Sequence, residues 1–120
     1  MLPACRAFGL GLIPYFPLES GFLTGKYAPG TTPADARLAA GPRASAVLTD
    51  ENFRRLERLR AIATAAGHSL LDLAMGWLLS HTEVASVISG ASGPEQVVAN
   101  VEASGWRLSQ GELEAVAAID

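Results

Sequence analysis

The residues best suited to hold a ligand follow the short apolar run at 84–88. Gly90 lets the backbone turn sharply and approach a ligand closely. Ser92 and Glu95 have the spacing of a capping box, with Pro94 inside the first turn of the helix that they would open. The free N–H groups and the positive dipole end of such a helix start would stabilise a bound anion.

Two amide side chains extend this pattern. Gln96 and Asn100 are four residues apart, so one helical face would direct both toward the same point. An ordinary β-turn-α connection with a polar helix start has the same spacing, because capping boxes are common. Spacing alone therefore leaves an anion site and a purely structural turn as two open interpretations.

The elements around this stretch alternate between strand and helix. Apolar runs that end at prolines or glycines predict buried strands at 9–13 and 85–88. Periodic apolar positions between capping and stop signals predict helices at 1–7, 51–66, 70–80, 94–104 and 109–119. Asp50 is the expected N-cap of the second helix. The segment 17–48 has little periodicity and is predicted to be a long loop.

This inventory predicts an α/β fold that is incomplete. Parallel strands joined by helices belong to an α/β sheet, and two strands cannot make a stable one, since both edges and both faces need covering. The whole chain, 1–120, is therefore expected to be one part of a larger domain.

Composition, charge and residue spacing argue against several classes of function. The net charge is −3, and the arginines at 54, 55, 58 and 60 alternate with Glu51 and Glu57 at helical spacing, so no nucleic-acid patch is expected. No apolar stretch is long enough for a membrane span, no signal peptide is evident, and no metal-ligand spacing occurs. The single cysteine, Cys5, fits a reducing compartment, so the cytoplasm is the expected location.

Four motifs then resemble one family. The stretch 14–27 (PYFPLESGFLTGKY) resembles the Tyr-Ser-Pro-Leu-x-x-Gly-x-Leu-Thr-Gly-Lys-Tyr stretch of aldo-keto reductases. The segment 88–92 (ISGAS), with Gln96 and Asn100, resembles the closing cofactor motif of that family. Segments 73–79 and 108–113 match two further signatures in the right order. The resemblance covers essentially the whole chain and is strongest to the branch of bacterial general reductases and potassium-channel β subunits.

The resemblance implies a (β/α)8 TIM barrel that binds NADP(H) across its C-terminal mouth and reduces carbonyls by hydride transfer. On that fold, residues 11–15 would be the seventh strand and 85–89 the eighth. The chain would thus be the C-terminal portion of the barrel and incomplete by itself.

The same resemblance assigns the cofactor residues. Tyr15 matches the aromatic that stacks on the nicotinamide. The loop along the pyrophosphate is matched by Pro17, Leu18 and Ser20. Basic residues that fold over the cofactor are matched by Lys26 and Arg37, with Arg43 a rival for the role of Arg37. The site for the adenosine half and its 2′-phosphate is matched by Gly90, Ser92, Gln96 and Asn100.

Three positions depart from the family pattern. Phe16 stands where a serine is usual, and Glu19 places a carboxylate near the expected pyrophosphate, which it would repel. Gly93 replaces a residue that is often basic and helps to select the 2′-phosphate. NADP is therefore the expected cofactor, with NAD possible.

The Asp, Tyr, Lys and His that do the chemistry in aldo-keto reductases match nothing in this chain. No catalytic residue is assigned, and the chain alone is expected to be inactive, because carbonyl reduction needs a placed proton donor. The function expected is the cofactor-binding part of an NAD(P)H-dependent aldo-keto reductase. The alternative is a non-catalytic nucleotide-binding or interaction module that assembles with a partner chain or itself through open sheet edges. The carbonyl substrate cannot be read from this sequence.

Overall fold

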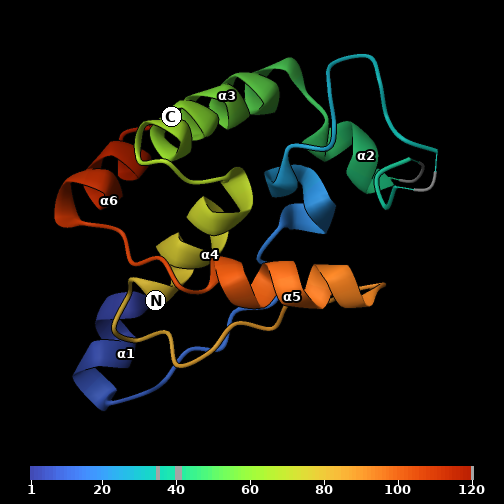
Figure 1. The fold of residues 1–120 in the computed structure, drawn as a ribbon. Coiled ribbons are helices and arrows are strands. Elements are labelled where there is room, and N and C mark those ends of the chain that lie inside the picture. Colours follow the sequence, from blue (N-terminus) through green and yellow to red (C-terminus); the bar gives the residue numbers. More distant parts are fainter. Residues whose placement is uncertain (35, 40–41, 120) are drawn as a thin grey trace.

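The computed structural model describes residues 1–34, 36–39 and 42–119. Helices dominate this part of the chain (Figure 1). In order they are α1 (Leu2–Phe8), the 3₁₀ helix η1 (Glu19–Thr24), α2 (Pro42–Val47), α3 (Asp50–Ala65), α4 (Leu70–Leu79), α5 (Pro94–Ala103) and α6 (Gln110–Ala117). All five predicted helices are confirmed, with bounds shifted by a residue or two.

Local signals explain where most of these helices begin and end. The Ser69 hydroxyl accepts from the Asp72 N–H, and the Asp72 carboxylate accepts from the Ser69 N–H, so α4 opens with a full capping box. Ser109 opens α6 in the same way. The predicted N-cap of α3 was wrong, because Thr49 caps the Asn52 N–H and Asp50 is already helical.

The two predicted strands run side by side but form no extended ladder. Parallel bridges join Leu12 to Val84 and Tyr15 to Ile88. The hydrogen bonds are Leu12 N–H to the Glu83 carbonyl at 2.7 Å, Ala85 N–H to the Leu12 carbonyl at 2.9 Å, and Ile88 N–H to the Pro14 carbonyl at 2.9 Å. The parallel direction of the two segments agrees with the sequence prediction. The prediction of full strands was wrong, because the described residues form isolated bridges instead. We call the segments 10–15 and 83–88 the paired segments.

The prediction of one long loop at 17–48 was wrong in part, since this segment contains η1 and α2. Phe16, Glu19 and Ser20 have positive φ values of 57°, 43° and 59°, so the backbone coils tightly after the first paired segment. This compact path brings Phe22 and Tyr27 into the core.

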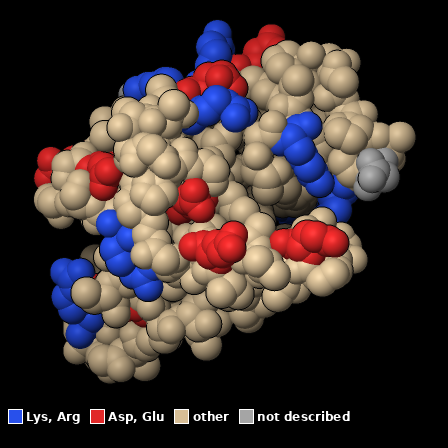
Figure 2. Space-filling view, in the orientation of Figure 1, with Lys and Arg blue, Asp and Glu red and all other residues tan. Residues whose placement is uncertain are grey.

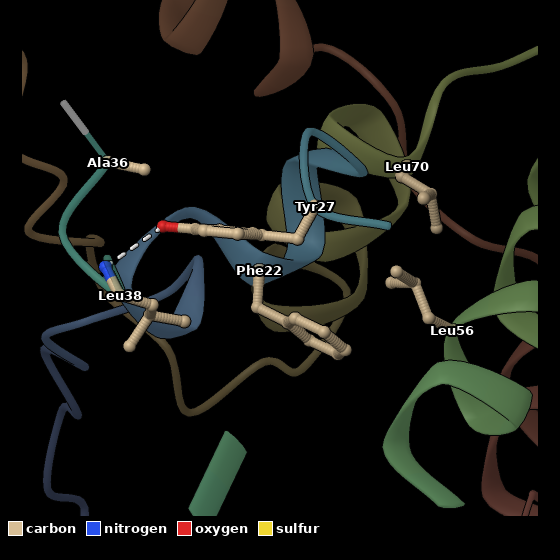
Figure 3. Close-up of a cluster of buried hydrophobic side chains, with 6 residues drawn as sticks. All are labelled: Phe22, Tyr27, Ala36, Leu38, Leu56 and Leu70. Atoms are coloured by element: carbon tan, nitrogen blue, oxygen red, sulfur yellow. Dashed lines mark hydrogen bonds between the residues drawn. The ribbon is translucent and has the colours of Figure 1, made fainter. Parts of the chain in front are cut away.

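Two apolar clusters hold the helices together. One, which we call the loop core, contains Phe22, Tyr27, Ala36, Leu38, Leu56 and Leu70 (Figure 3). It fixes η1 and the following loop against α3 and α4. The other contains Ala63, Leu73 and Leu108 and joins α3 and α4 to the segment before α6. The helix α4 packs against both α3 and α5, so it is the central element of the chain (Figure 1).

Charges are dispersed over the surface. Figure 2 shows acidic and basic side chains interspersed over the visible face, without one basic patch. On α3, Arg55 pairs with Glu51 at 2.6 Å and Arg60 with Glu57 at 3.2 Å, as the helical spacing predicts. In the described part of the chain, no single helix is long and apolar enough to cross a membrane, and α3 with α4 passes such a test only as a pair bent by 86°.

Candidate cofactor site

The candidate site lies where the paired segments end. The bridge between Tyr15 and Ile88 places the end of one segment beside the end of the other. Gly90 follows two residues after Ile88. A cavity of about 260 Å³ opens there, lined by Tyr15, Phe16, Pro17, Leu18, Ser20, Arg37, Ile88, Ser89 and Gly90. In parallel α/β folds, ligands bind at this end of the strands.

Tyr27 holds the loop that forms one wall. Its hydroxyl donates to the Ser20 carbonyl at 3.0 Å and accepts from the Leu38 N–H at 3.3 Å. Figure 3 shows the second of these bonds, which ties the loop after η1 to the segment that carries Arg37. One buried phenol thus fixes both the Ser20 wall and the Arg37 wall of the cavity.

Arg37 is positioned by its neighbours. Ala36 and Leu38 are buried in the loop core, whereas Arg37 between them is exposed. A methyl group built on Gly90 would lie 3.7 Å from Arg37 Nη2, so the guanidinium sits directly beside this glycine. The cavity therefore combines an aromatic ring, a cation and an open stretch of backbone. That set suits an anionic ligand with a flat ring.

Six predicted site residues line this cavity together: Tyr15, Pro17, Leu18, Ser20, Arg37 and Gly90. Lys26 does not line it. Its side chain packs over Gly21, and its Nζ lies 5.3 Å from the centroid of the Tyr27 ring. Lys26 would have to leave this contact to reach a phosphate in the cavity.

The predicted capping box at the start of α5 was wrong. Gly93 is the N-cap, with extended backbone and no side-chain cap. The Ser92 N–H and hydroxyl instead donate to the Gln96 side-chain oxygen, at 3.0 and 3.3 Å. Because α5 begins one residue later than the spacing predicts, Ser92 lies before the N-cap.

Gln96 and Asn100 have different recorded neighbours, since the Gln96 side-chain oxygen accepts from Ser92. Asn100 lines a separate cavity of about 410 Å³ between α5 and the second paired segment. Ser89 lines both cavities, and its hydroxyl oxygen is buried without a hydrogen-bond partner in the part of the chain described. Ser89 lies within the segment 88–92 that resembles the closing cofactor motif, although it was not assigned as a site residue.

Arg43 and the two unusual residues of the loop also meet. Arg43 Nη2 lies 2.5 Å from Glu19 Oε1, and the guanidinium carbon lies 5.5 Å from the Phe16 ring centroid. Nothing in the sequence predicted a contact among Phe16, Glu19 and Arg43. Their contact depends on α2 folding back against η1, which local spacing does not reveal.

The carboxyl groups with displaced pKa lie away from this cavity. Hydrogen bonds, chiefly from its own backbone N–H and then from Arg6, hold the pKa of Glu83 below its ordinary value of 4.5. The backbone N–H and hydroxyl of Ser109 lower the pKa of Glu112. Within the described residues, no group of three His, Cys, Asp or Glu side chains is arranged to hold a metal ion.

Comparison with known proteins identifies the class to which this fold and cavity belong. The family model described as the aldo/keto reductase family matches residues 1–120. A glycerol dehydrogenase from Gluconobacter oxydans superposes with a TM-score of 0.76 and 28% identity, over 99% of this chain and 36% of that protein. The chain therefore belongs to the aldo-keto reductase family.

Individual relatives have several functions. A probable voltage-gated potassium channel β subunit from rice is 44% identical over 105 residues, which are 85% of this chain and 32% of that protein. The L-glyceraldehyde 3-phosphate reductase of Escherichia coli is 39% identical over 108 residues, 86% of this chain and 31% of that protein. The NADH-specific methylglyoxal reductase of E. coli is 34% identical over 93% of this chain and 34% of that protein. The chain thus spans about a third of the length of these relatives.

Proposed function

We propose that this chain is the cofactor-binding, C-terminal portion of an NAD(P)H-dependent aldo-keto reductase barrel. The observation that carries the proposal is the cavity at the ends of the paired segments, where Tyr15, Arg37 and Gly90 come together. In this reading, residues 11–15 and 85–89 are the seventh and eighth barrel strands. Their parallel bridges and the match to a glycerol dehydrogenase support it.

The residues present fit part of a dinucleotide. A cavity of about 260 Å³ is smaller than typical pockets for whole ligands, so it would take the nicotinamide and the adjoining phosphates. Tyr15 would present a ring face to the nicotinamide, and Arg37 would pair with a phosphate. When bound, the nicotinamide supplies the hydride for carbonyl reduction. NADP is the proposed cofactor, and NAD is the alternative.

The adenosine half would lie along Ser92, Gln96 and Asn100, as the family motif implies. Gln96 would exchange its hydrogen bonds with Ser92 for contacts to the ligand. Lys26 would swing from the Tyr27 ring to a phosphate. Both movements are small side-chain changes at exposed positions.

Proton donation is assigned to no residue of this chain. The Tyr27 hydroxyl is engaged with Ser20 and Leu38 and buried, so it cannot reach a carbonyl substrate in the cavity. Tyr15 is assigned to stacking on the nicotinamide ring of the cofactor. We therefore propose that the polypeptide alone is inactive and that the parent enzyme, working in the cytoplasm, supplies the acid and the substrate pocket.

Titration with NADPH tests this proposal. We expect saturable binding, seen as a change in nicotinamide fluorescence, and an affinity about tenfold weaker in Arg37→Gln. Arg54→Gln removes the same charge from an exposed position on α3 and is expected to leave the affinity unchanged. Equal loss in both variants, or no binding by the unmodified chain, would contradict the proposal.

The open edges of the paired segments favour a second function, assembly with another chain. Among the described residues, the backbone groups of Gly11, Ile13 and Val87 make no backbone hydrogen bond. Large apolar side chains flank these edges, including Leu10, Ile13 and Ile88. Unpaired edges of this kind bind further strands. A non-catalytic module would use them to join a partner or a second copy.

Co-expression separates the two functions. A chain that carries the first six strands of an aldo-keto reductase barrel should form a one-to-one complex with this protein and gain NADPH-dependent aldehyde reduction. A complex without activity would favour the non-catalytic module. The absence of any complex would contradict assembly through these edges.

A further inference from the structure

The contact between Glu19 and Arg43 has a consequence for the candidate site. Glu19 stands between Leu18 and Ser20, and both of these neighbours line the cavity. A free carboxylate at this position would repel the phosphates of a dinucleotide. Arg43, from α2, lies 2.5 Å from that carboxylate and so offsets its charge.

A second contact fixes where this arginine lies. The guanidinium of Arg43 lies over the ring of Phe16, 5.5 Å from its centroid, and Phe16 is itself part of the cavity wall. Arg43 thus contacts both residues that depart from the family pattern in this loop. The two departures and the arginine form one unit, which we call the Arg43 triad (Phe16, Glu19 and Arg43).

The ion pair within the triad contributes little to the free energy of folding. The side chains of Arg43 and Glu19 are 59% and 39% exposed. Ion pairs at such exposure have small effects on stability, because water already screens the charges. The effect of this pair is therefore expected in the local potential at the cavity and in the shape of the 16–20 loop.

We propose that Arg43 is a positioning and charge-screening residue that makes this loop compatible with a bound nucleotide phosphate. Arg43 neutralises Glu19 and holds Phe16 in the wall, whereas Arg37 contacts the phosphate itself. The inference rests on the proposed function, since its ligand is the same dinucleotide. It adds a positioning residue that the family motifs quoted above do not contain.

A different role for Arg43 makes a different prediction. If Arg43 bound the phosphate directly, Glu19 would compete with the ligand for it. Neutralising Glu19 would then free the arginine and tighten binding, and removing Arg43 would weaken binding whether or not Glu19 were charged. A double-mutant cycle separates the two roles.

The experiment measures NADPH affinity for the full chain and for three variants, Arg43→Gln, Glu19→Gln and the double substitution. Screening predicts that Arg43→Gln weakens binding about fivefold, that Glu19→Gln changes it less than twofold, and that the double variant regains most of the lost affinity. The loss in Arg43→Gln should shrink as salt is raised, because screening by ions replaces the arginine.

Arg60→Gln is the matched control. Arg60 forms an exposed pair with Glu57 at 3.2 Å on α3, and neither residue lines the candidate cavity. Its loss should leave NADPH affinity unchanged. Circular dichroism of each variant checks that the helices remain formed.

Three outcomes overturn the inference. Unchanged NADPH affinity in Arg43→Gln would show that Arg43 has no role in binding. A double variant that binds NADPH as weakly as Arg43→Gln would show that Arg43 does not act by screening the charge of Glu19. In both cases the proposed function would stand, because the unmodified chain binds. No binding by the unmodified chain would overturn the proposed function together with this inference.

Discussion

Leu56 and Ile88 are side chains of similar size in opposite surroundings. Leu56, in the loop core, is 1% exposed, whereas Ile88, in the second paired segment, is 60% exposed. Helices α3 and α4 bury apolar side chains in the two clusters, whereas large apolar side chains stay exposed on the paired segments and on α5. The comparison shows that the core of the described chain lies around α3 and α4 and that the paired segments lie at its surface.

Substitution of these two residues should give the largest difference. Leu56→Ala leaves a cavity in the loop core and is expected to lower the free energy of unfolding by about 2–5 kcal/mol. Ile88→Ala removes an exposed side chain and should change it by no more than about 0.5 kcal/mol. Urea unfolding of the two variants checks this contrast. Equal losses would mean that Ile88 is buried in solution, by a second copy or by another part of the protein.

Substitutions at two helix starts should give a smaller difference in stability. Ser69→Ala removes half of the capping box of α4 and should cost about 1 kcal/mol. Ser92→Ala removes a hydroxyl whose one hydrogen bond within the described residues is to Gln96, so it should cost well under that amount. Thermal unfolding compares the two variants. A larger loss for Ser92→Ala would contradict the assignment of Gly93 as the N-cap of α5.

The aromatic end of the first paired segment can be tested by binding. Tyr15 is 72% exposed, so its ring is available to a ligand and adds little to the core. Tyr15→Leu should weaken NADPH binding about threefold to tenfold, the value of one aromatic stacking contact. It should leave urea unfolding unchanged. A loss of stability without a loss of affinity would make Tyr15 a packing residue.

The smallest expected effect is on the pH dependence of stability, through Glu83 at the start of the second paired segment. The folded-state pKa of Glu83 is lowered, so its charge stabilises the fold above the unfolded-state pKa near 4.5, and this stabilisation is lost as pH falls through the lower folded-state value. Urea unfolding at pH 6 and pH 3 should show a smaller acid loss in Glu83→Gln than in the unmodified chain. Identical losses would show that the hydrogen bonds to the Glu83 carboxylate, from its own backbone N–H and from Arg6, do not persist in solution.

The sequence predicted the helices well because their signals are local. Ser69, Ser109 and Gly9 act on neighbouring backbone groups, and each works as predicted. Ser92 does not cap α5 because the helix begins one residue later, with Gly93 as its N-cap. Spacing alone does not decide which of two adjacent residues takes the N-cap position.

The paired segments and the cavity were harder to predict for a different reason. Strand pairing depends on neighbours that are distant in sequence, and the described residues of the paired segments form two isolated bridges. The Tyr27 hydroxyl holds the loop segment that carries Arg37, and the bridge between Tyr15 and Ile88 places Gly90 beside it. Resemblance to the aldo-keto reductases assigned both residues to the cofactor, whereas composition and periodicity did not connect them.

Amide chemical-shift mapping with NADPH tests the central claim most directly. If the ends of the paired segments hold a nicotinamide dinucleotide, the amide signals of Tyr15, Ser20, Arg37 and Gly90 should shift together as NADPH is added. Signals of α3, on which Arg54 lies, should remain in place. No shifts at millimolar NADPH, or shifts confined to residues outside this cavity, would contradict the account.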